Sequence, residues 1–99
     1  MAARGPSDRD ISSFRNFFRD FPDYNIRLTS HARQRMGQRE IRLPQIRRIP
    51  GTGTVREVAR DIRTGRDKYR VAGRDADGRD LQVVVTLGPG RRVTVVTAI

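Results

Sequence analysis

The feature that most constrains the fold is a change in the spacing of apolar residues at Gly51-Thr52-Gly53. Before this point apolar side chains recur every three or four positions, which is typical of amphipathic helices. After it they alternate with polar side chains, which is typical of strands. The sequence therefore predicts helices followed by a sheet, the arrangement of an α+β domain.

Residues 1–7 are small and polar, and we expect them to be a linker remnant ahead of a single domain over residues 8–99. From Asp8 onward, Ile11 and four phenylalanines recur at helical spacing until Pro22 ends the pattern. Because buried phenylalanine stabilises a small domain strongly, this aromatic stripe is expected in the core.

Two more helices are expected before the change in spacing. Asp23-Tyr24-Asn25 is expected to form a turn into the second helix, which Thr29 or Ser30 can cap. A third, short helix or helical turn, closed by Pro50-Gly51, is indicated by apolar residues at every third position, namely Leu43, Ile46 and Ile49.

Four strands are expected after the break, at residues 54–62, 68–73, 80–87 and 92–98. In the first strand, alternation puts Val58 and Ile62 on one side and Val55 on the other. The connections are short and rich in turn residues, which favours antiparallel neighbours. The third strand is the most apolar and should be central. We therefore expect a four-stranded antiparallel sheet with two or three helices packed on one face.

The formal net charge is +10, with 20 arginines and a single lysine. Such a charge favours a polyanionic partner, because neutralising phosphates releases condensed counterions. Two other interpretations remain: a bias toward arginine codons, and a surface that meets an acidic protein.

Several classes of site are disfavoured by composition. The chain has no cysteine, which excludes disulfides and thiolate metal sites. The single histidine and scattered acids predict no metal site, and the sequence has no phosphate-binding loop, so no cofactor is expected. The longest aliphatic run, Val83–Val85, is too short to cross a membrane, and the first residues lack the apolar stretch of a secretory signal.

The only histidine lies in the second predicted helix. His31, Arg35 and Arg39 are four residues apart and should form one stripe, while Ala32 and Met36 lie beside it and should face the core. RNA carries its own nucleophile, the 2′-hydroxyl, so cleavage needs only a group that moves protons and cations that stabilise the phosphate. The alternatives are a structural histidine, solvated arginines and ordinary sheet residues.

The segment Leu28–Ile41, the Lys68-Tyr69-Arg70-Val71 strand and the ending Val93–Thr97 together resemble a family of small bacterial domains, mostly of unknown function, with a T-x-H-A-x-x-R-M-x-x-R-x-I helix. This family is similar to RelE-like and barnase/EndoU/colicin-type ribonuclease toxins. The resemblance covers residues 28–98 and implies a RelE- or barnase-like fold.

The resemblance implies a metal-independent ribonuclease toxin that cleaves tRNA or other structured RNA in the cytoplasm of a target cell. It implies catalytic roles for His31, Arg35 and Thr97. RNA contacts are implied for Arg39, Lys68, Tyr69 and Arg70. It also implies an acidic immunity protein or antitoxin, and delivery as the C-terminal tip of a larger secreted effector. The alternatives are a non-catalytic RNA- or DNA-binding module and a domain that binds an acidic protein.

Overall fold

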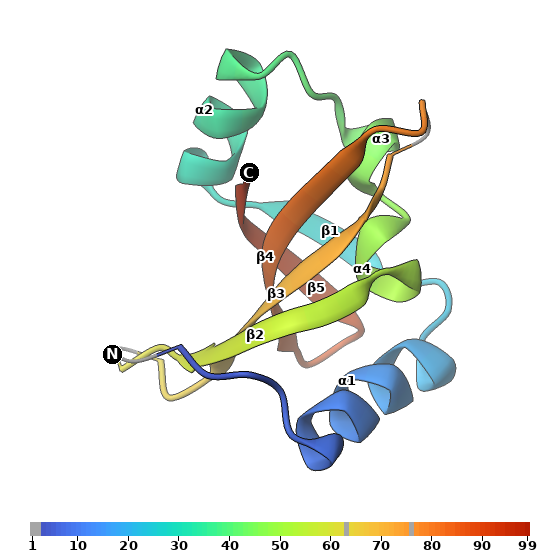
Figure 1. Ribbon diagram of the computed structural model, residues 1–99, viewed down its shortest axis with the longest axis vertical. Coiled ribbons are helices and arrows are strands. Elements are labelled where there is room, and N and C mark those ends of the chain that lie inside the picture. Colours follow the sequence, from blue (N-terminus) through green and yellow to red (C-terminus); the bar gives the residue numbers. More distant parts are fainter. Residues whose placement is uncertain (1–2, 63, 76) are drawn as a thin grey trace.

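The computed structural model describes residues 3–62, 64–75 and 77–99. Figure 1 shows its helices and strands in chain order. They are α1 (Asp8–Asp20), β1 (Asn25–Leu28), α2 (Ser30–Gln38), α3 (Leu43–Ile46), α4 (Ile49–Thr52), β2 (Thr54–Arg60), β3 (Asp67–Arg74), β4 (Asp80–Gly88) and β5 (Arg92–Ala98).

The strands form one sheet in the order β1-β5-β4-β3-β2. Neighbours from β5 to β2 are antiparallel, whereas β1 runs parallel to β5, with Ile26 opposite Val93 and Leu28 opposite Val95. The α+β class is confirmed, but the expected four-stranded antiparallel sheet is wrong, because the sheet is mixed and has five strands. The sequence does not predict β1, which begins at Asn25 where a turn is expected. The reason is that its partner strand, β5, lies far along the chain, so no short turn between the two strands marks the pairing.

The four strands predicted from alternation are present, with ends within two residues of those expected. β4 is the middle strand of the sheet, as its apolar sequence predicts. Val83 and Val85 on β4 are completely buried. The core therefore lies between the centre of the sheet and the helices.

A bulge in β2 decides which of its side chains face the core. The register with β3 shifts between Val55 and Glu57, and both Val55 and Val58 are buried. The expectation that these valines lie on opposite sides is wrong, because the bulge adds Arg56 to the strand. Ile62, expected on the side of Val58, lies beyond the end of β2 and is 80% exposed.

The start of α1 follows from its capping residues. The Asp10 amide donates to Ser7 Oγ at 3.1 Å, and the Ser7 amide donates to Asp10 Oδ2 at 3.0 Å. Phe14 is buried, and its ring centroid lies 4.9 Å from that of Tyr69. Arg4 pairs with Val58 through two backbone hydrogen bonds, so part of the segment expected to be a linker contacts the sheet.

Two short helices replace the single third helix expected from the sequence. α3 ends at Ile46 and α4 begins at Ile49, and both isoleucines are buried. Pro50 lies in the first turn of α4, where its missing N–H is tolerated, instead of closing a helix.

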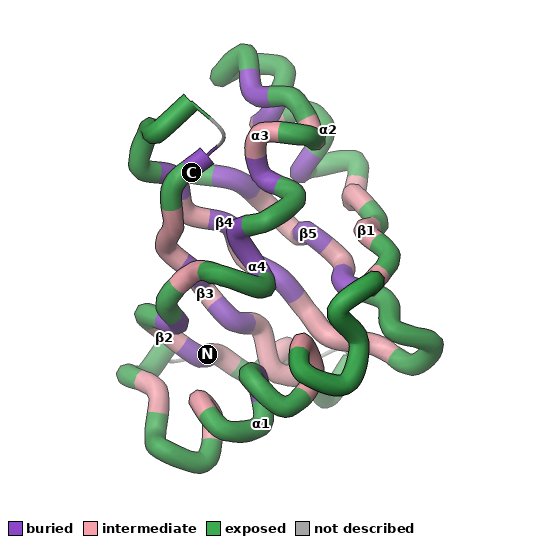
Figure 2. Tube along the Cα trace, turned by 90° about the vertical axis from the view of Figure 1, so that its right-hand side faces the viewer, coloured by how far each residue is buried: buried purple, intermediate pink, exposed green. Residues whose placement is uncertain are grey.

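The helices leave one face of the sheet open. α1, α3 and α4 lie in front of the sheet in Figure 2, and α2 packs against β5 and β1. Most of the strand side chains that alternate with the buried ones are partly exposed, and the rest are exposed. The partly exposed residues, which we call the outer face, are Glu57, Ala59, Lys68, Arg70, Ala72, Gln82, Val84, Thr86, Thr94, Val96 and Thr97.

Candidate nucleic-acid interface

The start of α2 is fixed to the sheet by Thr29. The Thr29 hydroxyl accepts a hydrogen bond from the Ala32 amide at 3.0 Å, which caps the helix. The same hydroxyl donates to the Val96 carbonyl at 2.9 Å, and the Thr29 amide donates to the Val95 carbonyl at 3.1 Å. His31, two residues further on, is therefore held near the edge of the sheet formed by β1 and β5.

The predicted stripe on α2 is present in part. Ala32 and Met36 are buried, as expected, while His31 is exposed and Arg35 is half-buried. Arg39 is the residue that caps the C-terminus of α2, and its amide donates to the Arg35 carbonyl at 3.1 Å. Arg39 thus lies just beyond the helix.

Three of the strand residues implied by the resemblance lie on the outer face. Thr97 is opposite Val84 in the sheet register. The Arg70 guanidinium binds Glu57 at 2.7 Å and also donates to Gln82, so its charge is largely satisfied within the protein. Lys68 Nζ lies 3.9 Å from Asp61 Oδ2.

Tyr69 does not share this face. It lies between Lys68 and Arg70 in β3, and the strand pleat turns it toward the helices, where it is 8% exposed. Burial raises the pKa of the Tyr69 phenol, and the nearby carboxylates of Asp67 and Asp10 raise it further. Since its ring packs in the core, Tyr69 is not part of the candidate interface.

A hollow of about 430 Å³ lies on the outer face beside Thr29, and we call it the threonine hollow. It is lined by Thr29, Asp61, Thr64, Arg66, Lys68, Thr86 and Val96. Lys68 is the one candidate site residue in this lining. His31, Arg35 and Thr97 do not line the threonine hollow, so the structure does not gather all the predicted catalytic residues in one cavity.

The ion pairs of the described residues are unevenly distributed. In the strands, Arg70 pairs with Glu57 at 2.7 Å and Arg74 with Asp80 at 3.5 Å. No ion pair within the described part of the chain involves the arginines of residues 27–56, which we call the basic segment. These arginines are Arg27, Arg33, Arg35, Arg39, Arg42, Arg47, Arg48 and Arg56.

The net charge of the whole chain does not identify most of these arginines as candidate site residues. The signal that identifies them is local: Glu40 is the single acidic residue of the basic segment. All of the arginines in the segment except Arg35 are exposed. The segment therefore presents uncompensated positive charge, which is the electrostatic footprint of a surface that binds polyanions.

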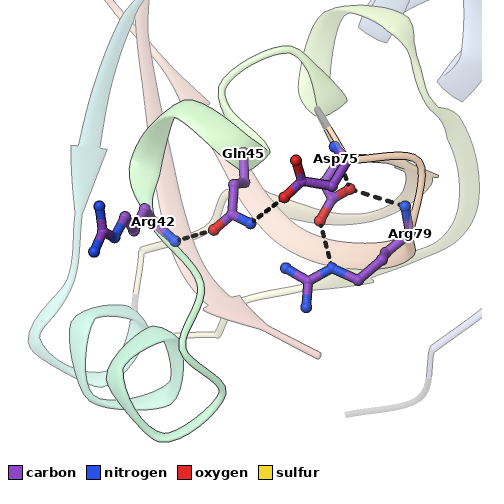
Figure 3. A network of polar contacts seen from close by, with 5 residues as sticks. Arg42, Gln45, Asp75 and Arg79 are labelled. Carbon is purple, nitrogen blue, oxygen red and sulfur yellow. Dashed lines mark hydrogen bonds and ion pairs between the residues drawn. The ribbon is translucent and has the colours of Figure 1, made fainter.

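Hydrogen bonds join α3 to the turn between β3 and β4 (Figure 3). Gln45 accepts from the Arg42 amide at 2.6 Å and donates to Asp77 at 2.9 Å. The buried Asp75 carboxylate accepts from the Asp77 amide and from the amide and Nε of Arg79. Burial raises the pKa of Asp75, but these hydrogen bonds and the Arg79 charge outweigh it, so that this pKa lies below its usual value. The network links Gln45 of α3 to the turn between β3 and β4.

The described residues offer neither a metal-binding group nor a membrane-spanning helix. In residues 3–62, 64–75 and 77–99, no three His, Cys, Asp or Glu side chains are grouped so that they could hold a metal ion. Within the same ranges, no helix is both long and apolar enough to cross a bilayer.

The fold and the charge distribution define the class of protein: a small α+β domain in which a basic helical segment packs on a mixed sheet. A family model described as "Domain of unknown function (DUF4258)" matches residues 28–99, so the chain belongs to this family. The match begins at the last residue of β1 and leaves α1 outside. No curated protein and no solved structure matches the chain. The expected membership of a family of unknown function is confirmed, and the finer similarity to ribonuclease toxins belongs to the proposal below.

Proposed function

We propose that this domain binds RNA through the basic segment and cleaves it without a metal ion, as an endoribonuclease toxin domain. The observation that supports this most is the combination, on α2, of an exposed imidazole with arginines that have no acidic partner among the described residues. Exposed guanidinium groups suit phosphates, because they form paired hydrogen bonds with two oxygens.

In the proposed reaction the RNA supplies the nucleophile. The 2′-oxygen forms a bond to the adjacent phosphorus, and the bond from phosphorus to the 5′-oxygen breaks. His31 accepts the proton of the 2′-hydroxyl, and the leaving 5′-oxygen takes a proton from water. Arg35 stabilises the charge of the reacting phosphate. The products are a 2′,3′-cyclic phosphate and a 5′-hydroxyl end.

The expected similarity of this family to ribonuclease toxins suggests the biological setting of the proposed reaction. The substrate would be tRNA or another structured RNA, met in the cytoplasm of a target cell. An acidic immunity protein or antitoxin would neutralise the domain by covering its basic surface, since opposite charges steer and orient such partners. Thr97 and Lys68 on the outer face would contact the RNA, while Arg70 is engaged by Glu57 and Gln82.

The test is cleavage of purified tRNA by the domain in EDTA. We expect discrete fragments with cyclic phosphate ends, and His31→Ala should lower the cleavage rate by about 100-fold or more. Because His31 is exposed, this variant should keep the melting temperature of the wild type. Arg9→Gln, an exposed change on α1, is the matched control and should cleave normally. Equal cleavage by His31→Ala and wild type would overturn the catalytic role.

One observation favours a second candidate, a non-catalytic RNA-binding module. His31 lines neither the threonine hollow nor any other described cavity, and no hydrogen bond in the described residues orients its ring. A catalytic histidine usually has a partner that fixes its tautomer. If the second candidate is correct, the EDTA assay will give a salt-sensitive mobility shift and no fragments.

A further inference from the structure

A second hollow, of about 540 Å³, lies at the end of the sheet where β3 ends and β4 begins. We call it the arginine hollow, because three arginines from different parts of the fold meet there. It is lined by Arg39, Arg56, Ala72, Gly73, Arg74, Asp80, Leu81, Gln82 and Ile99.

The fold brings each arginine to the arginine hollow for a local reason. Arg39 is there because α2 ends at this residue. Arg56 is there because it is the extra residue of the β2 bulge, and bulges commonly redirect a side chain. Arg74 is the last residue of β3 and lies 3.5 Å from Asp80 across the strand pair. These three residues are distant in sequence and meet only in the folded chain.

The charge of the arginine hollow favours an anion. Asp80 pairs with Arg74, which leaves Arg39 and Arg56 without an acidic partner in the described part of the chain. Two free guanidinium groups at one opening can bind a phosphate in a planar, paired geometry. The remaining lining contains no aromatic ring, so stacking of bases on aromatic side chains does not contribute there. Contacts to the nucleic-acid backbone would therefore dominate.

The length of α2 sets the distance between the arginine hollow and His31, where the proposed cleavage takes place. Arg39 follows His31 by eight residues, which is about 12 Å along a helix axis at about 1.5 Å per residue. Arg35 lies between them on the same stripe. A stacked strand advances about 3.4 Å per nucleotide, so about 12 Å corresponds to three or four nucleotides.

We propose that the arginine hollow binds a backbone phosphate of single-stranded RNA, three or four nucleotides away from the phosphate that lies at His31. The strand runs along α2, past Arg35, and enters the hollow between Arg39 and Arg56. This inference rests on the proposed binding of RNA, but not on the proposed cleavage.

The experiment measures binding to His31→Ala protein, so that no substrate is consumed. Fluorescent oligouridylates of two and eight nucleotides are titrated against this protein and against the same protein carrying Arg56→Gln or Arg39→Gln. For the long oligonucleotide, each change should weaken binding about five- to tenfold and reduce the slope of log affinity against log salt by about 0.7. The short one cannot span both positions, so its affinity for the protein that keeps Arg39 and Arg56 should be at least about tenfold lower than that of the long one.

Arg9→Gln in the same His31→Ala protein is the matched control, because it removes one exposed positive charge far along the chain from the arginine hollow. Its effect on the long oligonucleotide should stay below about twofold. The amide resonances of Gly73 and Gln82 give a local measure and should shift with the long oligonucleotide.

Three outcomes would overturn the inference: no binding of the long oligonucleotide, a loss with Arg56→Gln no larger than that with Arg9→Gln, or equal affinities for the two lengths. Failure of the proposed cleavage is read separately, from the absence of fragments with wild-type protein in EDTA. If RNA binding depends on Arg56 but the wild-type protein produces no RNA fragments, the phosphate site in the arginine hollow is supported and the proposed cleavage is wrong.

Discussion

Gly53 is a residue at which the packing leaves no space for a side chain. A Cβ atom there would lie 2.5 Å from the Ala72 carbonyl oxygen and 2.8 Å from the Ile49 carbonyl oxygen. The backbone at Gly53 is extended, so the requirement is steric and not conformational. We expect Gly53→Ala to lower the free energy of unfolding by about 1–3 kcal/mol, measured by urea denaturation.

Gly37→Ala is the control for this prediction. A Cβ at Gly37 would meet no atom within 4 Å, and the residue lies inside α2. Alanine should therefore raise the free energy of unfolding by about 0.5–1 kcal/mol, because glycine loses more conformational entropy in a helix. Equal stabilities for the two variants would contradict the close approach of α4 and β3 at Gly53.

Among the candidate site residues, the sequence predicts the exposed stripe on α2 better than it predicts the strand residues. His31 and Arg35 follow from the helical period alone, whereas Arg39 lies just beyond the helix. The resemblance implies roles for three consecutive residues, Lys68, Tyr69 and Arg70, but adjacent strand residues point to opposite faces. The alternation of strand side chains alone therefore predicts that Tyr69 does not share a surface with its neighbours. The pairing of Arg70 with Glu57, in contrast, can be predicted only when the register between β2 and β3 is known.

At the scale of elements, α2 is predictable because its signals are local. A threonine cap, buried residues four positions apart and an early end near Gly37 all lie within one short segment. β1 has no such signal, because a parallel partner lies at the opposite end of the chain. The bulge in β2 is equally hidden, since it is defined only by the register with β3.

The turn between β3 and β4 should make stability depend on pH. The pKa of Asp75 is lower in the folded protein than its ordinary value of 3.8, so its carboxylate stabilises the fold above that value. This contribution is lost as the pH falls through the folded pKa. We expect the melting temperature of the wild type to fall between about pH 5 and pH 2. Asp75→Asn should melt lower at neutral pH and show a smaller fall in acid.

Asp10 adds to the same acid dependence, because the amide of Ser7 lowers its pKa in the capping box of α1. The Asp75→Asn variant should therefore keep part of the fall in melting temperature at acidic pH. If the melting temperature of Asp75→Asn falls as much in acid as that of the wild type, the Asp75 carboxylate does not contribute to the pH dependence of stability. Scanning calorimetry over this pH range measures both proteins.

For the whole molecule, the concentration of unpaired arginines in the basic segment predicts how RNA binding depends on salt. If the basic segment contacts three or more phosphates of a single strand, the slope of log affinity against log salt will be about −2 or steeper. Combining Arg33→Gln with Arg47→Gln removes two cations of this segment. That double variant should reduce the slope by about 1.4, measured by fluorescence anisotropy at several salt concentrations.

The matched control removes two cations that have acidic partners. Arg19 lies 3.9 Å from Asp20, and Arg60 lies 3.6 Å from Asp67. Arg19→Gln combined with Arg60→Gln produces the same change in net charge, but these cations lie outside the basic segment. Equal slopes for the two double variants would indicate that net charge alone, and not its distribution, governs binding.

The sequence by itself determines the α+β class, the four antiparallel strands, the central place of β4 and the excess of positive charge, because periodicity and composition are properties of neighbouring residues. The tertiary structure decides the parallel strand β1, the faces of Val55 and Val58, and the pairing of Arg70 with Glu57. It also brings Arg39, Arg56 and Arg74 to one hollow. These features depend on contacts between distant segments, and a local pattern carries no information about which distant segment a residue will meet.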